Sequence, residues 1–143
     1  MSESSLVYPM SAMVLLTMFV LVRMFRARVG AVKAGQIDAN FYRLFQGATE
    51  PAATQKVSRN FSNLFEAPTL FYVVCLAAMV TGVTGLVMVA LAWAYVATRM
   101  AHTAIHLGPN KLRWRIRAYF LSWATLAAMW VTLVIGIAGR ASS

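Results

Sequence analysis

Four long apolar segments, at residues 6–25, 60–80, 86–106 and 116–138, dominate this sequence. Each has roughly the 20 helical residues needed to cross the hydrocarbon core of a bilayer. The chain has 143 residues and 60% of them are hydrophobic, so little is left for a domain outside a membrane. We therefore expect an all-α integral membrane protein: one domain over residues 1–143, folded as a bundle of four transmembrane helices, with a cytoplasmic loop at residues 29–58.

The basic residues are concentrated in two of the three connections, although the net charge is +9 overall. The connection at residues 81–85 has no charge, whereas the other two carry Arg23, Arg26, Arg28, Lys33, Arg43, Lys56 and Arg59, and Lys111, Arg113, Arg115 and Arg117. By the positive-inside rule both basic segments face the cytoplasm, which puts the N- and C-termini on the non-cytoplasmic side. Topology thus explains the charge without a nucleic-acid partner, and contact with anionic membrane lipids fits the same residues.

Glu66 stands out because a charged group inside a membrane-spanning segment costs roughly 2.5 to 3.5 kcal/mol at a helix centre. On a continuous helix, Arg59, Asn63 and Glu66 share one face because they are four and three residues apart. The third apolar segment has a similar stripe: Tyr95, Arg99, His102 and His106. Chain direction puts both stripes in the same leaflet, with Glu66 and Arg99 each roughly 10 Å from the basic loops. We expect these two side chains to be partners.

Several interpretations of this polar cluster are open. The simplest is a buried Glu66–Arg99 ion pair that fixes helix register. The stripes hold more polar groups than one pair requires, which favours a cavity for an anionic or zwitterionic molecule, with a hydrophobic co-substrate arriving from the lipid. A proton or ion pathway is a weaker interpretation, because the opposite leaflet has no matching stripe. We expect no metal site, because His102 and His106 lack a well-placed third ligand.

Two segments of the chain resemble the MAPEG family, the membrane-associated proteins in eicosanoid and glutathione metabolism. They are residues 59–68 (RNFSNLFEAP) and 99–108 (RMAHTAIHLG). The specific part of the match is Asn-x-x-Glu on the second helix together with Arg-x-x-His and Leu-Gly on the third. His106 stands where family enzymes commonly have Tyr, and Pro68 lies unusually close to Glu66. The resemblance is therefore to a divergent, bacterial-type member, a multi-pass protein of the bacterial inner membrane.

The resemblance implies a homotrimer that binds glutathione in clefts between subunits near the cytoplasmic face. By position, Asn63, Glu66, Arg99 and His102 match residues of the family's glutathione-binding network, and His106 takes the place of the usual Tyr. The activating arginine most nearly matches Arg115, with Arg113 or Arg117 as alternatives after a small shift. A basic residue at the end of the first helix, Arg23 or Arg26, is implied to reach a neighbour's glutathione. Arg59 and Arg117 complete the candidate binding residues.

The implied function is a membrane-bound glutathione transferase or peroxidase acting on lipophilic electrophiles or lipid hydroperoxides. A thiol is a poor nucleophile until it ionises, and a cationic neighbourhood lowers its pKa from about 8.5. Arginine suits this task because it stays charged in a partly dry site. The alternative is a non-catalytic trimeric membrane protein that binds a lipid or another anionic ligand in the polar cluster.

Overall fold

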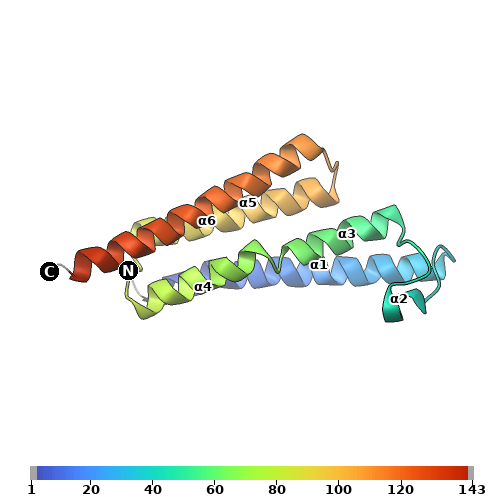
Figure 1. Ribbon diagram of the computed structural model, residues 1–143, viewed down its shortest axis with the longest axis horizontal. Coiled ribbons are helices and arrows are strands. Elements are labelled where there is room, and N and C mark those ends of the chain that lie inside the picture. Colours follow the sequence, from blue (N-terminus) through green and yellow to red (C-terminus); the bar gives the residue numbers. More distant parts are fainter. Residues whose placement is uncertain (1–2, 142–143) are drawn as a thin grey trace.

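The computed structural model describes residues 3–141 and consists of helices joined by short connections (Figure 1). After a 3₁₀ turn at Glu3–Leu6 come α1 (Val7–Lys33), α2 (Phe41–Leu44), α3 (Ala52–Asn63), α4 (Ala67–Val80), α5 (Leu86–Leu107) and α6 (Leu112–Ala141). Four helical stretches are long and apolar enough to cross a membrane: Val7–Lys33, Ala52–Val80, Leu86–Leu107 and Leu112–Arg140. The predicted all-α fold with four transmembrane helices is confirmed.

The helices form two antiparallel pairs that lie side by side (Figure 1). One pair is α1 with the α3–α4 stretch, and the other is the α5–α6 hairpin. The connections at residues 34–51 and 108–111 share one end of the bundle, which we call the loop end. The 81–85 turn lies at the other end, where Arg140 of α6 donates hydrogen bonds to the carbonyls of Thr81 and Gly82. Both basic connections therefore lie at one end of the molecule, as the charge pattern predicts.

The buried face of α5 changes from apolar to polar along its length. In its first half the buried side chains include Met88, Val89, Ala92 and Val96, while the Tyr95 ring stacks on Phe71 of α4 with 4.5 Å between centroids. From Arg99 onward, by contrast, the buried residues are all polar: Arg99, His102, Thr103 and His106. The hydrophobic core therefore fills the half of the bundle away from the loop end, and a polar interior begins one turn beyond Tyr95.

Two helices, α1 and α3, extend into the loop expected at residues 29–58, so that loop is shorter than expected. α1 continues about two turns past residue 25, and Ala31 in this extension is buried in a small cluster with Ile37 and Phe41. Residues 52–58, expected to belong to the 29–58 loop, form the first turns of α3, in which Thr54 and Val57 are buried. Packing against α1 stabilises these polar turns, which a search for apolar segments cannot detect. The connection is reduced to residues 34–51.

Candidate functional site

The second membrane-spanning stretch is broken at residues 64–66, between α3 and α4. The continuous helix expected over 60–80 is therefore wrong at Glu66, which caps α4 with φ −88° and ψ −100°. Pro68 explains the break: it has no N–H to donate to the Leu64 carbonyl, and its ring clashes with that carbonyl in a continuous helix. α3 ends instead with two hydrogen bonds to the residue three positions earlier, from Leu64 N to Phe61 O (3.0 Å) and from Phe65 N to Ser62 O (2.9 Å).

This break supplies the partner of Arg99. In a continuous helix the Asn63 carbonyl would accept a hydrogen bond from the N–H of Ala67; here it accepts one from Arg99 Nη2 at 2.8 Å. The Arg99 side chain is 0% exposed, and its Nε and Nη1 have no hydrogen-bond partner within residues 3–141. Arg99 is therefore a buried guanidinium with one of its three nitrogens bonded.

The expected ion pair between Glu66 and Arg99 is not formed in the part of the chain that the structure describes. The expectation required Glu66 to follow Asn63 on the same helical face. Because the helix stops at Asn63, Glu66 lies outside that stripe, and it is exposed to solvent. A backbone carbonyl takes the place of the Glu66 carboxylate as the hydrogen-bond acceptor for Arg99, and the carboxylate is left to face the adjoining cavity.

That cavity, of about 650 Å³, lies at the loop end between α3 and α6, and we call it the polar cavity. α3 contributes Gln55, Ser58, Arg59, Ser62 and Asn63, and Glu66 follows at the break. His102 and His106 of α5 and Arg115, Ile116 and Tyr119 of α6 line it as well. Arg28, Phe45 and Glu50 complete its lining. Three guanidinium groups and two carboxylates thus surround one space, with a surplus of positive charge.

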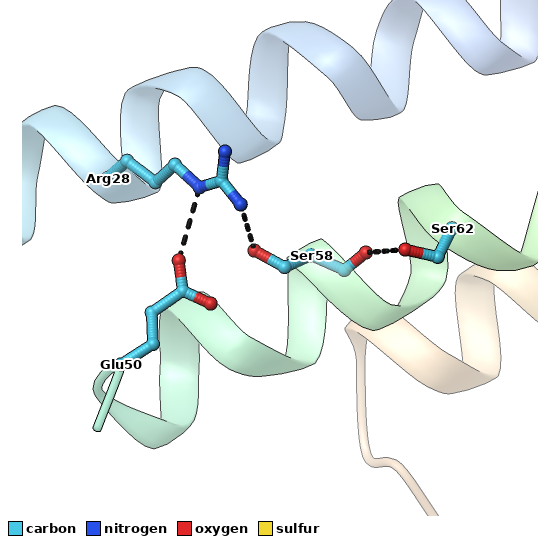
Figure 2. Close-up of polar contacts among 4 residues, drawn as sticks. All are labelled: Arg28, Glu50, Ser58 and Ser62. Carbon is cyan, nitrogen blue, oxygen red and sulfur yellow. Dashed lines mark hydrogen bonds and ion pairs between the residues drawn. The ribbon is translucent and has the colours of Figure 1, made fainter. Parts of the chain in front are cut away.

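An ion pair anchors the 34–51 connection beside this cavity (Figure 2). Arg28 Nε lies 3.1 Å from Glu50 Oε1, and Arg28 Nη2 donates to Ser58 Oγ at 3.1 Å. The same guanidinium lies over the rings of Tyr42 and Phe45, 5.1 and 5.4 Å from their centroids. Burial raises the pKa of the Tyr42 phenol, and the negative charge of Glu50 adds to the effect. Arg28 therefore joins α1, α3 and the connection.

The opposite wall distinguishes Arg115 from its basic neighbours. Arg115 is half-buried, lines the polar cavity and donates from Nη1 to Asn110 Oδ1 at 2.8 Å. Arg113 and Arg117 are exposed and do not line it, and the Arg117 guanidinium lies over the Trp114 ring, 4.9 Å from its centroid. One arginine of the 113–117 cluster thus faces the cavity.

The two histidines are almost fully buried beside the cavity. His102 is 2% exposed and His106 is 3% exposed, and their rings meet edge to face with centroids 5.5 Å apart. The Tyr119 ring lies 6.1 Å from His102. The Nδ1 atoms of both histidines have no hydrogen-bond partner within residues 3–141. No third Cys, Asp, Glu or His joins them in that part of the chain as a metal site would require.

The structure thus gathers most of the candidate residues and leaves four apart. Arg59, Asn63, Glu66, His102, His106 and Arg115 line the polar cavity, and Arg99 lies behind Asn63. Arg23, Arg26, Arg113 and Arg117 do not line it. The sequence interpretation missed Arg28, Glu50, Gln55, Ser58, Ser62 and Tyr119. Helical spacing could have identified three of these residues. Gln55 lies four residues before Arg59 and Ser62 lies three residues after it, so both share its helix face. Tyr119 lies four residues after Arg115 and shares the face of that residue.

The comparison with protein families decides what kind of protein this is. The MAPEG family model matches residues 6–135, which include all of the residues that line the polar cavity. The chain belongs to the MAPEG family. Comparisons with curated proteins and with solved structures give no match. This MAPEG protein is therefore a multi-pass membrane protein of a family associated with eicosanoid and glutathione metabolism, with its polar residues gathered at the loop end.

Proposed function

We propose that this MAPEG protein is a glutathione-dependent transferase or peroxidase that acts on lipophilic electrophiles or lipid hydroperoxides. One observation carries the proposal: Arg28, Arg59 and Arg115 line a single cavity together with the carboxylates of Glu50 and Glu66. Glutathione carries two carboxylates, one ammonium group and a thiol. A site for it needs several cationic groups and at least one anionic group close together, and the polar cavity has both.

The size and the unpaired atoms of the site fit a ligand of this kind. A volume of about 650 Å³ is within the range of small-molecule sites. Buried polar atoms in proteins normally have partners, yet Arg99 Nε and Nη1 and the Nδ1 atoms of His102 and His106 have none within residues 3–141. We infer that Arg28 and Arg59 bind the carboxylates of glutathione, that Glu66 binds its ammonium group, and that the histidines donate to or accept from its backbone.

Arg115 is the residue to which we assign the thiol chemistry. Bound glutathione supplies a thiol that reacts as the thiolate. A guanidinium in a partly buried site keeps its charge and lowers the pKa of a nearby thiol. Arg115 is half-buried at the cavity wall, and Tyr119, one turn further on, lines the same cavity. Arg113 and Arg117, which are exposed outside the cavity, are poorer candidates.

The lipophilic partner would enter from the membrane. Ile116 and Phe45 give the polar cavity apolar borders, and Phe120 and Leu121 of α6 are 66% and 57% exposed on the surface of the helix. Such side chains face lipid or a neighbouring subunit in a membrane protein. We infer that a hydrophobic electrophile reaches the thiolate along α6, while glutathione enters from the loop end.

The assembly and location belong to the same proposal. We infer a homotrimer in the bacterial inner membrane, with the basic loop end in the cytoplasm and both termini on the other side. Of the α1 arginines, Arg28 lines this subunit's polar cavity, whereas Arg23 and Arg26 do not. A contact from either of those two to a neighbour's glutathione stays a prediction.

A matched pair of variants tests the reaction. The rate of glutathione conjugation to an aryl halide, and of organic hydroperoxide reduction, is measured for Arg115→Ala and Arg113→Ala in the full protein. We expect kcat/KM to fall about 100-fold or more in Arg115→Ala, since removing one group that stabilises developing charge has effects of that size. Arg113→Ala should stay within a few-fold of wild type. A wild-type protein without either activity would favour the alternative, a trimer that binds a lipid or another anion without catalysis.

A further inference from the structure

A second groove, separate from the polar cavity, runs between α1 and α5 and has a volume of about 700 Å³. Its apolar lining includes Ala12, Leu15 and Phe19 of α1 and Met100 of α5. Leu15, Phe19 and Met100 are 66%, 53% and 54% exposed, so the groove is open on the outer surface of the subunit. It has no lining residue in common with the polar cavity. We call it the α1–α5 groove.

The groove is apolar except for two side chains. Arg23 is the charged residue among those that line it, and no carboxylate does so. Arg23 is exposed and has no hydrogen-bond or ion-pair partner within residues 3–141. An unpaired guanidinium beside an apolar surface attracts an anion that carries its own apolar part, because it binds phosphate and carboxylate with several donors.

Thr103 is the second polar side chain, and it is 3% exposed. Helical threonines usually donate to a carbonyl in the preceding turn, and several in this chain do so: Thr17, Thr69, Thr98, Thr125 and Thr132. The Thr103 hydroxyl is different, because it has no hydrogen-bond partner within the described residues. A buried hydroxyl without a partner is destabilising unless a ligand or another group completes its bonding.

The two polar groups lie toward the loop end of the groove. α1 and α5 both run toward that end (Figure 1), and Arg23 lines the groove together with Leu107 and Gly108, where α5 ends. From Arg23 back to Ala12 the helix rises about 16 Å, and the side chains on this path are apolar. The groove thus has a cationic head region at the level of a membrane surface and an apolar tail region toward the bilayer centre.

We propose that the α1–α5 groove binds an anionic phospholipid, with its phosphate on Arg23, an ester carbonyl on the Thr103 hydroxyl, and one acyl chain along Phe19, Leu15 and Ala12. Charge complementarity identifies the occupant, because the lining has one cation and no anion. A neighbouring subunit or the lipophilic substrate would not need a cation at the head of the groove. The proposal uses residues outside the polar cavity, and it gives Arg23 a lipid phosphate in place of the neighbour's glutathione that the family resemblance implies.

The test uses purified full-length protein in detergent and two lipids with identical acyl chains, phosphatidylglycerol and phosphatidylcholine. Native mass spectrometry counts bound lipid, and thermal unfolding measures stabilisation. We expect wild type to retain phosphatidylglycerol preferentially. Its thermal unfolding midpoint should rise more with phosphatidylglycerol than with phosphatidylcholine. Arg23→Gln should remove the preference, whereas Lys33→Gln, which loses the same charge from the same helix outside the groove, should keep it. Equal binding of the two lipids by wild type, or a preference that survives in Arg23→Gln, would overturn the proposal.

Two further variants separate a lipid from a neighbouring subunit. Thr103→Val keeps the shape of the side chain and should weaken binding of both lipids, because both have ester carbonyls; unchanged binding would contradict the contact. Ala104→Phe should fill the groove and displace phosphatidylglycerol without changing the mass of the protein assembly. If the assembly dissociates while lipid preference is retained, another subunit covers the groove and the phospholipid assignment is wrong.

Discussion

Arg99 shows most clearly how a single residue connects the fold to the candidate site. It is fully buried, and within residues 3–141 its one hydrogen bond is to the carbonyl of Asn63. A buried charge with few partners is destabilising. A residue that served only stability would have a fuller set of partners, so we infer that Arg99 acts on the ligand site through Asn63, which lines the polar cavity.

Replacing Arg99 with methionine distinguishes a ligand-related role from a structural one. Met has a similar length and no charge, and apolar replacement of buried charges is often neutral or stabilising. We expect Arg99→Met to unfold at or above the midpoint of wild type without ligand, and to lose stabilisation by glutathione. Thermal unfolding in detergent with and without glutathione measures both quantities. A variant that is strongly destabilised but still responds to glutathione would show that Arg99 is a structural residue.

At the scale of elements, the break between α3 and α4 positions the site. Pro68 ends the continuous helix, the break releases the Asn63 carbonyl to Arg99, and Glu66 turns toward the polar cavity. The loop end is then completed by Arg28, whose bonds to Glu50 and Ser58 join the 34–51 connection to α1 and α3 (Figure 2). Irregular backbone within a span is typical of positions that line a cavity or face protein.

Restoring the helix should therefore impair the site. In Pro68→Ala, residue 68 regains an N–H and the steric clash with the preceding turn disappears, so α3 and α4 can join. We expect amide hydrogen exchange to slow at residues 64–68 and glutathione binding to weaken by about tenfold, because Arg99 loses its carbonyl partner. Exchange measured by mass spectrometry on peptides covering residues 60–70 tests the first effect. Faster exchange, or unchanged exchange with unchanged binding, would contradict the link between the break and the site.

The elements also show what the sequence could and could not reveal. The four membrane-spanning segments follow from the length of the apolar stretches alone. The direction of the chain then predicts that the polar residues of the second and third segments lie at the same end of the bundle. The start of α3 was missed because its first turns are polar and depend on packing against α1. The break could have been predicted from Pro68, because a proline inside a helical segment interrupts the helix. The Arg28–Glu50 ion pair joins residues that are 22 positions apart in the sequence. Helical spacing relates residues only three or four positions apart, so it could not have predicted this pair.

At the scale of the whole molecule, a single subunit leaves much apolar surface uncovered. Large hydrophobic side chains are exposed along the length of α1 and α6, among them Phe19, Phe25, Phe120 and Ile135. In membrane proteins such surface faces lipid or packs against the helices of a neighbouring subunit. Asn60 of α3 is also fully buried, with both amide atoms unpaired within the described residues. Because this burial is within the single chain, the Asn60 amide belongs to the interior of the helix bundle and not to a contact between subunits.

We expect the protein to purify as a homotrimer. Native mass spectrometry of the detergent-solubilised protein should give three chains per particle, and the trimer should survive dilution because apolar helix faces pack against each other. A monomer that binds one glutathione with undiminished affinity would contradict a subunit arrangement that contributes to the site.

The most direct test of the glutathione site is thermal unfolding of the purified protein over a series of glutathione concentrations. A ligand that binds only the folded state stabilises it by an amount that grows with concentration, about 2.7 kcal/mol at one hundred times Kd. We predict a rising midpoint for wild type, a much smaller rise for Arg59→Gln, which alters the wall of the polar cavity, and an unchanged response for Lys33→Gln, which does not. A wild-type midpoint that does not move at millimolar glutathione would contradict the assignment of the polar cavity to this ligand.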